Sequence, residues 1–470
     1  MIDVSDGCWG VSQEFSKAKL RDKRLLARVE LIVGALAARP EDSFPEAMGS
    51  STALKGLYRF VNSPGVDHEA LLESHILNTV ERAKIAQDVL AIHDTSKFKF
   101  PRLPASEVGE LNTGKPGFFA HPTLLVDANT ERCPLGVVAL STIHRDPDRP
   151  RRNDLSGSEC AKLQDKESER WFHAAQQTEW RLAHKARVIH VMDREGDSYE
   201  LYAQLLEHKY RFVIRGDDRT CLFEGEHTRI KEALSKQQII AEREVTLKRR
   251  ITQTKAPNSA RPVREARVAR LTVAGCTLTL KRPHSLGDDV PKQIVLNVVH
   301  VFEPAPPEGA EPVEWFLLST EPIETNEQLL RVVDIYRHRW VIEEFFKALK
   351  TGCQYEARRL ESLEGLLVAL VLLLPIACQT LWLRGCARTT PDAPAEGLVN
   401  ETQEQIIRHL SPRKLPPSPT VRELVWAIAA LGGHLKNNGE PGWQVLGRAW
   451  QRILSLEEGW RAAVQFSKNL

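Results

Sequence analysis

The sequence predicts an α/β fold in which a mixed sheet with flanking helices carries a β-rich insertion and lies between helical N- and C-terminal regions. Residues 14–85 place apolar side chains at helical spacing. From residue 86, three β-rich runs are followed by alternating helix-like and strand-like runs, which is typical of a sheet covered by helices. Residues 216–312 return to β-branched alternation broken by Pro-rich turns.

The composition is that of a globular protein and does not by itself indicate a partner. The chain has 470 residues, 42% of them hydrophobic, which is enough for roughly two to four domains. Lys plus Arg total 64 and Asp plus Glu total 62, so only local charge clusters can indicate nucleic-acid binding. The eight cysteines are scattered without a CxxC pair, which argues against a zinc site and favours a reduced, cytoplasmic compartment.

Residues 1–85 are predicted to form a helical domain. The run at 15–37 has helical periodicity, and a second helix at 51–63 follows a Ser/Thr start signal. The first helix and the residues before it are densely basic: Lys17, Lys19, Arg21, Lys23, Arg24 and Arg28. This face suits DNA, although a solvated charged face is the alternative. The first residues contain acids and no apolar run, so we expect no signal peptide.

Residues 86–385 are predicted to form the domain that carries the sheet. The expected strands are 88–100, 121–128, 134–144, 186–193 and 210–215, and the expected helices between them are 160–184 and 198–208. The β-rich insertion at 216–312 is basic at Lys248, Arg249, Arg250, Arg264, Arg267 and Arg270. A Pro/Thr-rich linker at 386–419 leads to a helical C-terminal domain at 420–470.

The run "GLLVALVLLLPIACQTLWL" at 365–383 is nearly long enough to cross a bilayer. Pro375 divides it, Gln379 and Thr380 interrupt its second half, and no second run of this kind exists. A buried core helix is therefore expected, with a membrane span as the alternative, and no membrane partner is predicted.

Three acidic residues are candidates for catalysis. Asp94 and Asp193 each close an apolar, strand-like run, a usual place for a metal ligand at a sheet edge, though taken singly each is also a typical turn cap. Glu343 lies in "YRHRWVIEEFFKALK", residues 336–350. Three carboxylates brought together repel one another and predict a divalent cation. Oxygen ligands indicate Mg²⁺ or Mn²⁺, with two ions per active site able to serve phosphodiester chemistry.

The run 336–350 reads as one amphipathic helix. At about 100° per residue, Tyr336, Arg339, Glu343 and Lys350 fall on one stripe, and Trp340 and Lys347 lie close to it. Apolar residues occupy the opposite arc. A stripe that mixes an acid, several bases and two aromatic rings suits a metal and a polyanion, so Tyr336, Arg339, Lys347 and Lys350 are predicted to bind phosphates.

These motifs together resemble the bacterial cut-and-paste DDE transposases of the insertion-sequence-four family, and within it the transposase of transposon five. The family signature Tyr, two residues, Arg, three residues, Glu, six residues, Lys is intact as Tyr336, Arg339, Glu343 and Lys350, while "HDTS" and "DREGD" resemble the family's two Asp motifs. The C-terminal "LGGHLKNNGEPGWQVLGRAW" resembles the family's dimerisation region.

The resemblance implies an RNase H-like catalytic domain with Asp94, Asp193 and Glu343 as metal-binding catalytic residues. It implies a hairpin mechanism in which Trp340 stacks on an extruded base and Trp315 probes the vacated space, while Arg215 contacts a phosphate. It also implies that Arg28 and Arg59 bind the transposon ends, and that a homodimer joins these ends to target DNA with catalysis in trans.

Two other functions share some of these features. An RNase H-like nuclease without strand transfer has the same carboxylates, and a non-catalytic transposase-derived DNA-binding or inhibitor protein has the same N-terminal domain. Nucleotide binding is not expected. The run "GELNTGKP" at 109–116 has the Gly and Lys spacing of a P-loop, but Pro116 replaces the Ser/Thr that binds Mg²⁺.

Overall fold

The computed structural model describes residues 11–130, 132–148, 167–236, 240–247, 265–435, 437 and 439–468. The chain divides into two compact units, which are described separately. Unit 1 comprises Met1–Arg170, Gln176–Arg187 and Trp340–Leu470, and unit 2 comprises Trp171–Ala175 and Val188–Arg339. Of the basic residues noted in the insertion, Lys248, Arg249, Arg250 and Arg264 lie outside the described residues.

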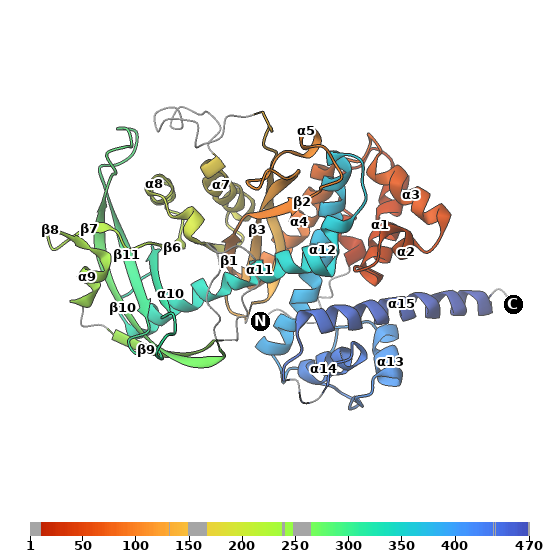
Figure 1. The fold of residues 1–470 in the computed structure, drawn as a ribbon. Coiled ribbons are helices and arrows are strands. Elements are labelled where there is room, and N and C mark those ends of the chain that lie inside the picture. The colour runs from red at the N-terminus through yellow and green to blue at the C-terminus, as the bar shows by residue number, and fades with distance from the viewer. Residues whose placement is uncertain are drawn as a thin grey trace. The chain divides into compact units, whose positions relative to one another are not determined.

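The N-terminal part of unit 1 is helical. Its elements are η2 (Val11–Phe15), α1 (Lys23–Ala38), α2 (Phe44–Met48), α3 (Ser51–Val61) and α4 (His68–Ala86), shown in red to orange in Figure 1. Three of these helices have an N-cap residue. The side chains of Asp22, Ser50 and Asp67 accept hydrogen bonds from backbone N–H groups in the first turns of α1, α3 and α4. These caps mark where the helices begin: α3 begins at Ser51, as the sequence predicts, whereas α1 begins at Lys23 and not at residue 15.

Four strands of unit 1 form the sheet that carries Asp94. They are β1 (Asp88–His93), β2 (Ser96–Lys99), β3 (Gly117–Asp127) and β4 (Pro134–Ile143), with the short helix α5 (Ala105–Val108) before β3. β3 pairs antiparallel with β1 and β2 along one edge and with β4 along the other. Every residue of β3 is buried, and α4 and α12 pack against β4. The sheet is therefore a core element covered by helices.

The apolar run at 365–383 forms part of one long helix, α12 (Leu363–Thr389). Within the most apolar 18-residue window of this helix, 94% is buried inside the protein. It packs against α3, α4, β4, α14 and α15 (Trp443–Lys468). The helix is buried on all sides rather than along one stripe, as expected for the central helix of a core.

The rest of the C-terminal region is helical. α13 (Glu401–Leu410) and α14 (Val421–Leu431) pack against α15, and all three are drawn in blue in Figure 1. The segment 386–419 was expected to be a linker, but α12 runs on to Thr389 and α13 lies inside this segment. The Pro-rich stretch after Leu410 is the part without regular structure, because proline lacks the N–H that a helix or strand requires.

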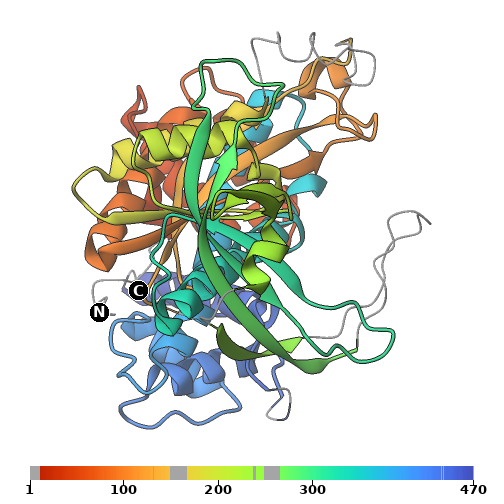
Figure 2. The same cartoon turned by 90° about the vertical axis from the view of Figure 1, so that its left-hand side faces the viewer.

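Unit 2 contains a mixed sheet with its own core. β5 (Arg187–Met192) and β6 (Phe212–Gly216) are parallel, and antiparallel pairing continues from β6 through β12, β11 and β10. These three strands are β10 (Arg267–Lys281), β11 (Gln293–Phe302) and β12 (Glu314–Ser319). The other strands and short helices of this unit are β7 (Thr220–Phe223), β8 (Glu226–Arg229), β9 (Ile240–Leu247), η5 (Arg194–Gly196) and α9 (Ile230–Ser235). Figure 2 shows β10 and β11 as long, curved green strands. The expected β-rich insertion is thus a continuation of the sheet.

Three helices complete unit 2 or join it to unit 1: α7 (Arg170–Leu182, after the turn η4, Glu167–Glu169), α8 (Tyr199–Glu207) and α10 (Asn326–His338). Tyr202 and Phe212 stack at 5.8 Å between ring centroids in the unit 2 core. The fold as a whole is mixed α/β, as the sequence predicts.

The run 336–350 is not one uninterrupted helix. α10 ends at His338, α11 (Trp340–Lys347) begins two residues later, and a π-helical turn η6 (Ala348–Gly352) follows, before the short turn η7 (Tyr355–Ala357). Tyr336 and Arg339 are buried, with 6% and 9% of their surface exposed, whereas Glu343 is exposed. The expectation of one uninterrupted helix is therefore wrong, although Arg339 at the break keeps right-handed helical backbone angles, with φ at −49° and ψ at −33°.

Candidate active site

Asp94 lies immediately after the last residue of β1, where the buried strand reaches the surface. Its side chain is half-buried, and its Oδ1 accepts a hydrogen bond of 2.7 Å from the backbone N–H of Thr95. The strand ends here because the chain turns into β2, which begins two residues later. The core strand thus fixes the backbone while the carboxylate remains accessible.

A buried hydrogen-bond group supports this turn. The Thr95 hydroxyl lies 2.9 Å from Nδ1 of His121 on β3 and accepts a hydrogen bond of 3.1 Å from Nε of Arg170. Burial, together with the nearby Arg170, lowers the pKa of His121 to about 3, so the ring is neutral at physiological pH. Thr95, His121 and Arg170 therefore hold the residue that follows Asp94 in one conformation, a contribution that the sequence analysis missed because His121 is 27 residues away in sequence.

Two adjacent glutamates on α11 have different environments. Glu344 is half-buried and forms an ion pair with Arg384 of α12, with an Arg384 Nη1 to Glu344 Oε1 distance of 2.9 Å. Glu343 is exposed and lies one residue, or about 100°, around the helix. Glu344 is thus held by an ion pair, whereas Glu343 is the exposed member of the pair.

The two aspartates of "DREGD" are likewise distinguished by their surroundings. Asp197 is buried among the hydroxyl of Tyr202, which donates at 2.6 Å, the guanidinium of Arg219 and the N–H of Asp217, which donates at 3.0 Å. Asp193 is half-buried at the end of β5, and its Oδ1 accepts a hydrogen bond of 2.9 Å from the N–H of Glu195. Asp197 is structural, whereas Asp193 is a cap whose second oxygen is available for a ligand.

Unit 2 gathers several of the predicted DNA-contacting residues around Tyr336. The ring of Trp315 on β12 lies 5.8 Å from the Tyr336 ring, and Arg215 on β6 interacts with the Tyr336 hydroxyl. Burial raises the pKa of Tyr336 despite the opposing effect of Arg339 and Arg215, and the charge of Asp193 raises it further. Tyr336, Arg339, Arg215 and Asp193 therefore lie within one electrostatic environment.

Arg215 is one of three described arginines, with Arg219 and Arg267, whose buried Nε has no hydrogen-bond partner. One Nη group donates at 3.4 Å to the carbonyl of Glu314, but the buried Nε has no hydrogen-bond partner among the described residues. A buried guanidinium N–H left without an acceptor is costly, and a phosphate oxygen is the acceptor that best suits it. This observation favours the predicted phosphate contact of Arg215.

Lys350 contributes the corresponding cation in unit 1. It lies in η6, and its Nζ donates at 2.8 Å to the hydroxyl of Ser96 and lies 5.1 Å from the centroid of the Phe98 ring. Burial lowers the pKa of Lys350; the charges of Glu356 and Asp94 oppose this effect, and those of Lys99 and Lys97 add to it. Lys350 and Asp94 therefore lie within electrostatic range of one another.

The remaining predicted contacts are on the surface. Trp340 begins α11 with 53% of its surface exposed, and Lys347 is exposed at the end of the same helix. In the N-terminal region, Arg28 on α1 and Arg59 on α3 are both exposed. The Arg28 guanidinium crosses Gly56 of α3 so closely that a Cβ there would lie 2.1 Å from its Nη1. The glycine thus allows the two basic helices to share one face.

A separate group of ligand-type side chains lies at the N-termini of α4 and α12. Asp67, His68 and Glu364 have ligand atoms within 4.8 Å of one another, and His68 Nδ1 lies 2.8 Å from Glu364 Oε1. Asp67 caps α4 by accepting a hydrogen bond of 2.9 Å from Glu69 N–H. An ion pair and a helix cap at two helix N-termini account for this arrangement without a metal.

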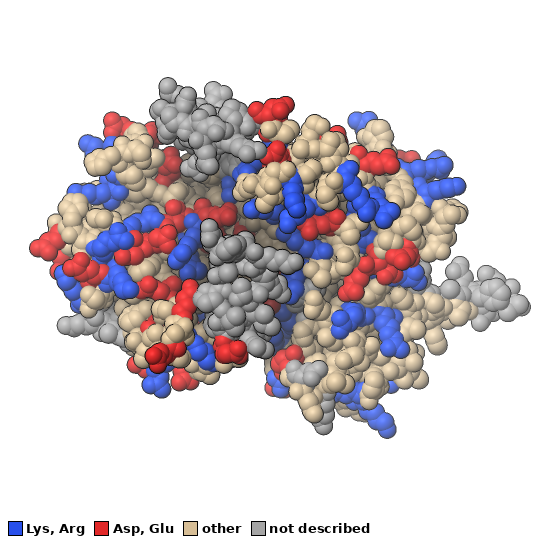
Figure 3. All heavy atoms as spheres, in the orientation of Figure 1, with Lys and Arg blue, Asp and Glu red and all other residues tan. Residues whose placement is uncertain are grey.

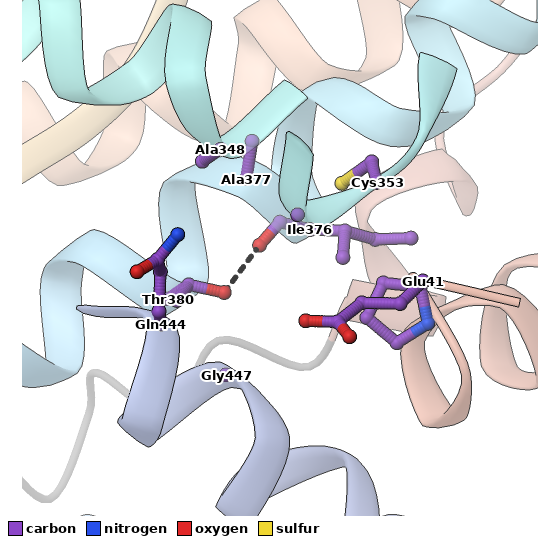
Figure 4. Close-up of a pocket in the computed structure, with 10 residues that line it drawn as sticks. Glu41, Ala348, Cys353, Ile376, Ala377, Thr380, Gln444 and Gly447 are labelled. Carbon is purple, nitrogen blue, oxygen red and sulfur yellow. Dashed lines mark hydrogen bonds between the residues drawn. The ribbon is translucent and has the colours of Figure 1, made fainter. Parts of the chain in front are cut away.

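Figure 4 shows a small crevice in unit 1 where α12, the η6 turn and α15 meet. Its labelled side chains are mostly apolar, and the Thr380 hydroxyl donates at 3.2 Å to the carbonyl of Ile376. Glu41 is the single ionisable side chain that carries charge at neutral pH among those lining it. The crevice therefore lacks the groups that phosphodiester chemistry requires, which are on the surface instead.

The predicted residues thus form two sets. Unit 1 contains Asp94, Glu343, Lys347, Lys350 and Trp340, and unit 2 contains Asp193, Arg215, Trp315, Tyr336 and Arg339. The carboxylates of Asp94, Asp193 and Glu343 are accessible oxygen donors of the type that Mg²⁺ and Mn²⁺ prefer. That the three meet around a common pair of metal ions remains a prediction.

Comparison with protein families gives two matches. A transposase DNA-binding model matches residues 9–66, which include the basic residues before α1 and the helices α1 to α3. A transposase DDE domain model matches residues 174–378, which include Asp193 and Glu343. DDE domains are RNase H-like, in agreement with the mixed sheet and its covering helices. The β-rich strands of unit 2 lie within the range of the second match.

Proposed function

We propose that this chain, a DDE transposase by its two domain matches, binds the ends of a transposon, cuts them through a hairpin and joins the 3′-ends to target DNA. The observation that best supports the cutting reaction is the position of the candidate carboxylates beside acids that are held in ion pairs. Asp197 of "DREGD" is held by Arg219 while Asp193 lies at the end of β5, and Glu344 is held by Arg384 while Glu343 is exposed.

The proposed metal ligands are Asp94, Asp193 and Glu343. Two divalent cations, when bound, lower the pKa of the attacking hydroxyl and stabilise the leaving oxygen. The protein's own residues position the DNA. Tyr336, Arg339, Lys347, Lys350 and Arg215 bind phosphates beside the scissile bond, and the Tyr336 hydroxyl interacts with Arg215.

The proposed reaction has four steps. Water attacks a phosphodiester at the transposon end and releases a 3′-hydroxyl. That hydroxyl attacks the opposite strand, forming a hairpin and breaking the bond to flanking DNA. Water reopens the hairpin, and the 3′-hydroxyl then attacks a target phosphodiester. Trp340, exposed at the start of α11, is placed to stack on a base extruded from the strained hairpin.

The N-terminal domain and the C-terminal helices have proposed partners. Arg28 and Arg59 bind the transposon ends, and α13 to α15 form the homodimer of a synaptic complex. We further propose membership of the insertion-sequence-four family and action on DNA in the bacterial cytoplasm. The intact family signature supports these proposals, as does the burial of α12, the one helix of the described chain apolar and long enough to cross a membrane.

The decisive experiment separates binding, cutting and joining. Purified protein is incubated with duplex DNA carrying an element end and its flank, in Mg²⁺ or Mn²⁺, and nicks, hairpins and joined products are separated on denaturing gels. We expect Asp94→Asn, Asp193→Asn and Glu343→Gln each to abolish nicking, since each removes a charged ligand oxygen at constant shape, while end binding is retained.

The matched control is Glu195→Gln, because Glu195 is an exposed carboxylate in the same turn as Asp193. It should nick DNA at the wild-type rate. Normal nicking by any of the three ligand variants would remove that residue from the catalytic role. Nicks without joined products would favour the nuclease, and binding without nicks would favour the non-catalytic protein.

A further inference from the structure

A set of basic side chains follows the edge strand next to Asp94. β2 begins two residues after Asp94 and ends the order of strands in the sheet. Lys97 and Lys99 are exposed and alternate with Ser96 and Phe98, so the two lysines project from one face at about 7 Å spacing. Lys350 is on the other face, where it contacts Ser96 and Phe98. Basic groups therefore flank the edge strand on both sides.

The loop before β3 extends this basic surface. Lys99 pairs with Gly117 across the β2–β3 ladder, and Phe100 N–H donates at 3.0 Å to the carbonyl of Pro116. The exposed Lys115 therefore adjoins the end of β2. The exposed Arg102, two residues after Phe100, does so as well. Lys115 belongs to the "GELNTGKP" run that resembles a P-loop without being one. We name Lys97, Lys99, Arg102 and Lys115 the β2 strip.

The β2 strip carries charge that the protein does not neutralise. Among the described residues, none of its four side chains has an acidic partner within 4.0 Å. The carboxylate of Glu356 is nearby, but its Oε1 accepts a hydrogen bond of 2.9 Å from the backbone N–H of Lys99. The effect of Lys97 and Lys99 on the pKa of Lys350 shows that these cations repel one another. A polyanion that binds these positive charges would offset their mutual repulsion.

The platform beneath the strip is rigid. Phe98 and Phe100 pack against Phe118 and Tyr355 with centroid distances between 5.1 and 5.9 Å. The Tyr355 hydroxyl donates at 2.8 Å to the carbonyl of Leu366 on α12. Figure 3 shows Lys and Arg side chains gathered over the region where β2 is drawn in Figure 1. The lysines are thus held on a fixed surface rather than on a mobile loop.

We infer that the β2 strip binds the phosphate backbone of duplex DNA beside the scissile phosphate, as a contact separate from the N-terminal DNA-binding domain. The inference rests on the proposed function, since Asp94 gives the strip its place next to the reaction. Lysines on an edge strand also prevent unwanted strand pairing, which is the competing explanation for Lys97 and Lys99.

The test measures binding of a fluorescent duplex, carrying an element end and its flank, by anisotropy from about 50 to 200 mM salt. Each phosphate contact contributes about 0.9 to the slope of log affinity against log salt, so Lys97→Ala with Lys99→Ala should lower the slope by about 2. The ratio of wild-type to variant affinity should then fall roughly tenfold across that range. Lys97→Arg with Lys99→Arg should restore the slope.

The matched control removes two exposed lysines elsewhere, by Lys84→Ala with Lys414→Ala, and should retain the wild-type slope. An unchanged slope for the β2 variant would overturn the inference, and aggregation of that variant with an unchanged slope would establish the edge-protection role instead. The proposed function fails separately, if wild-type protein binds the duplex but never cuts it in Mg²⁺. A lowered slope in that case would leave the β2 strip as a DNA contact.

Discussion

At the scale of single residues, the role of an acidic or basic side chain depends on whether it already forms an ion pair or hydrogen bond within the protein. Asp197 and Glu344 are held by Arg219 and Arg384, whereas Asp193 is half-buried at the end of β5 and Glu343 is exposed on α11. The same reasoning applies to Arg215, whose buried Nε has no acceptor among the described residues. An accessible acid or an unsatisfied donor is therefore a better indication of function than the residue type alone.

Trp340 gives a prediction at this scale. Trp340→Ala should permit first-strand nicking but slow hairpin formation by on the order of tenfold or more, because stacking on a base contributes about 1–3 kcal/mol. Product analysis over time separates the two steps. Trp180→Ala is the control, since Trp180 is also exposed, at 75%, but lies on α7 outside the candidate site. Hairpins that accumulate at the normal rate in the Trp340 variant would exclude stacking.

At the scale of elements, buried charge pairs connect the helices of unit 1. Glu14 of η2 is 3% exposed, and its carboxylate accepts a hydrogen bond of 2.6 Å from Arg82 and lies 2.6 Å from Nδ1 of His75, both on α4. His75 Nε2 in turn accepts a hydrogen bond of 3.0 Å from the N–H of Val137 on β4. One carboxylate therefore links the start of the DNA-binding segment to the sheet that carries Asp94.

This link makes stability depend on pH. Burial by itself raises the pKa of Glu14, but Arg82 and His75 outweigh it and lower the pKa from 4.5 to about 2. The stabilisation, on the order of 3 kcal/mol, is fully present above pH 4.5 and is lost as the pH falls towards 2, because the unfolded chain takes up the proton first.

Urea unfolding at several pH values checks this prediction. The wild-type unfolding free energy should exceed that of Glu14→Gln by a margin that shrinks as the pH falls from 5 towards 3. Glu30→Gln, which changes an exposed acid on α1, should follow the wild-type curve. A constant margin between wild type and the Glu14 variant would mean that Glu14 acts through its shape and not through its charge.

At the scale of the whole molecule, the transposase DNA-binding match and the candidate carboxylates belong to different parts of the chain. The DNA-binding match ends at residue 66, and the candidate carboxylates begin at Asp94. A protein lacking one function is therefore expected to keep the other. If the proposed homodimer acts in trans, each subunit cuts the DNA end that its partner binds.

A mixing experiment tests this arrangement. Asp94→Asn protein is expected to bind ends without cutting, and protein with Arg28→Ala and Arg59→Ala is expected not to cut because it no longer binds ends. Incubated together on end DNA with Mg²⁺, the two should nick the DNA although neither does so alone. Mixed dimers that form, as judged by co-purification through a tag on one subunit, yet leave the DNA intact would contradict catalysis in trans.

The sequence by itself determined the fold class, the helical N-terminal region and the positions of most strands and helices. These properties depend on local periodicity and on start signals such as the Ser/Thr residues at the start of α3, which neighbouring residues set. The ordered spacing of the acidic motifs also indicated a transposase, in agreement with the two domain matches.

Only the tertiary structure decided which residue of each acidic pair is accessible, how the helix at 336–350 is broken, and which charges surround Asp94. His121, Arg170 and Lys350 come near the turn at Asp94 through packing between residues far apart in the chain, whereas Lys97 and Lys99 are its close neighbours in sequence. No local pattern encodes such contacts, because burial and electrostatics depend on what the rest of the chain places beside each side chain.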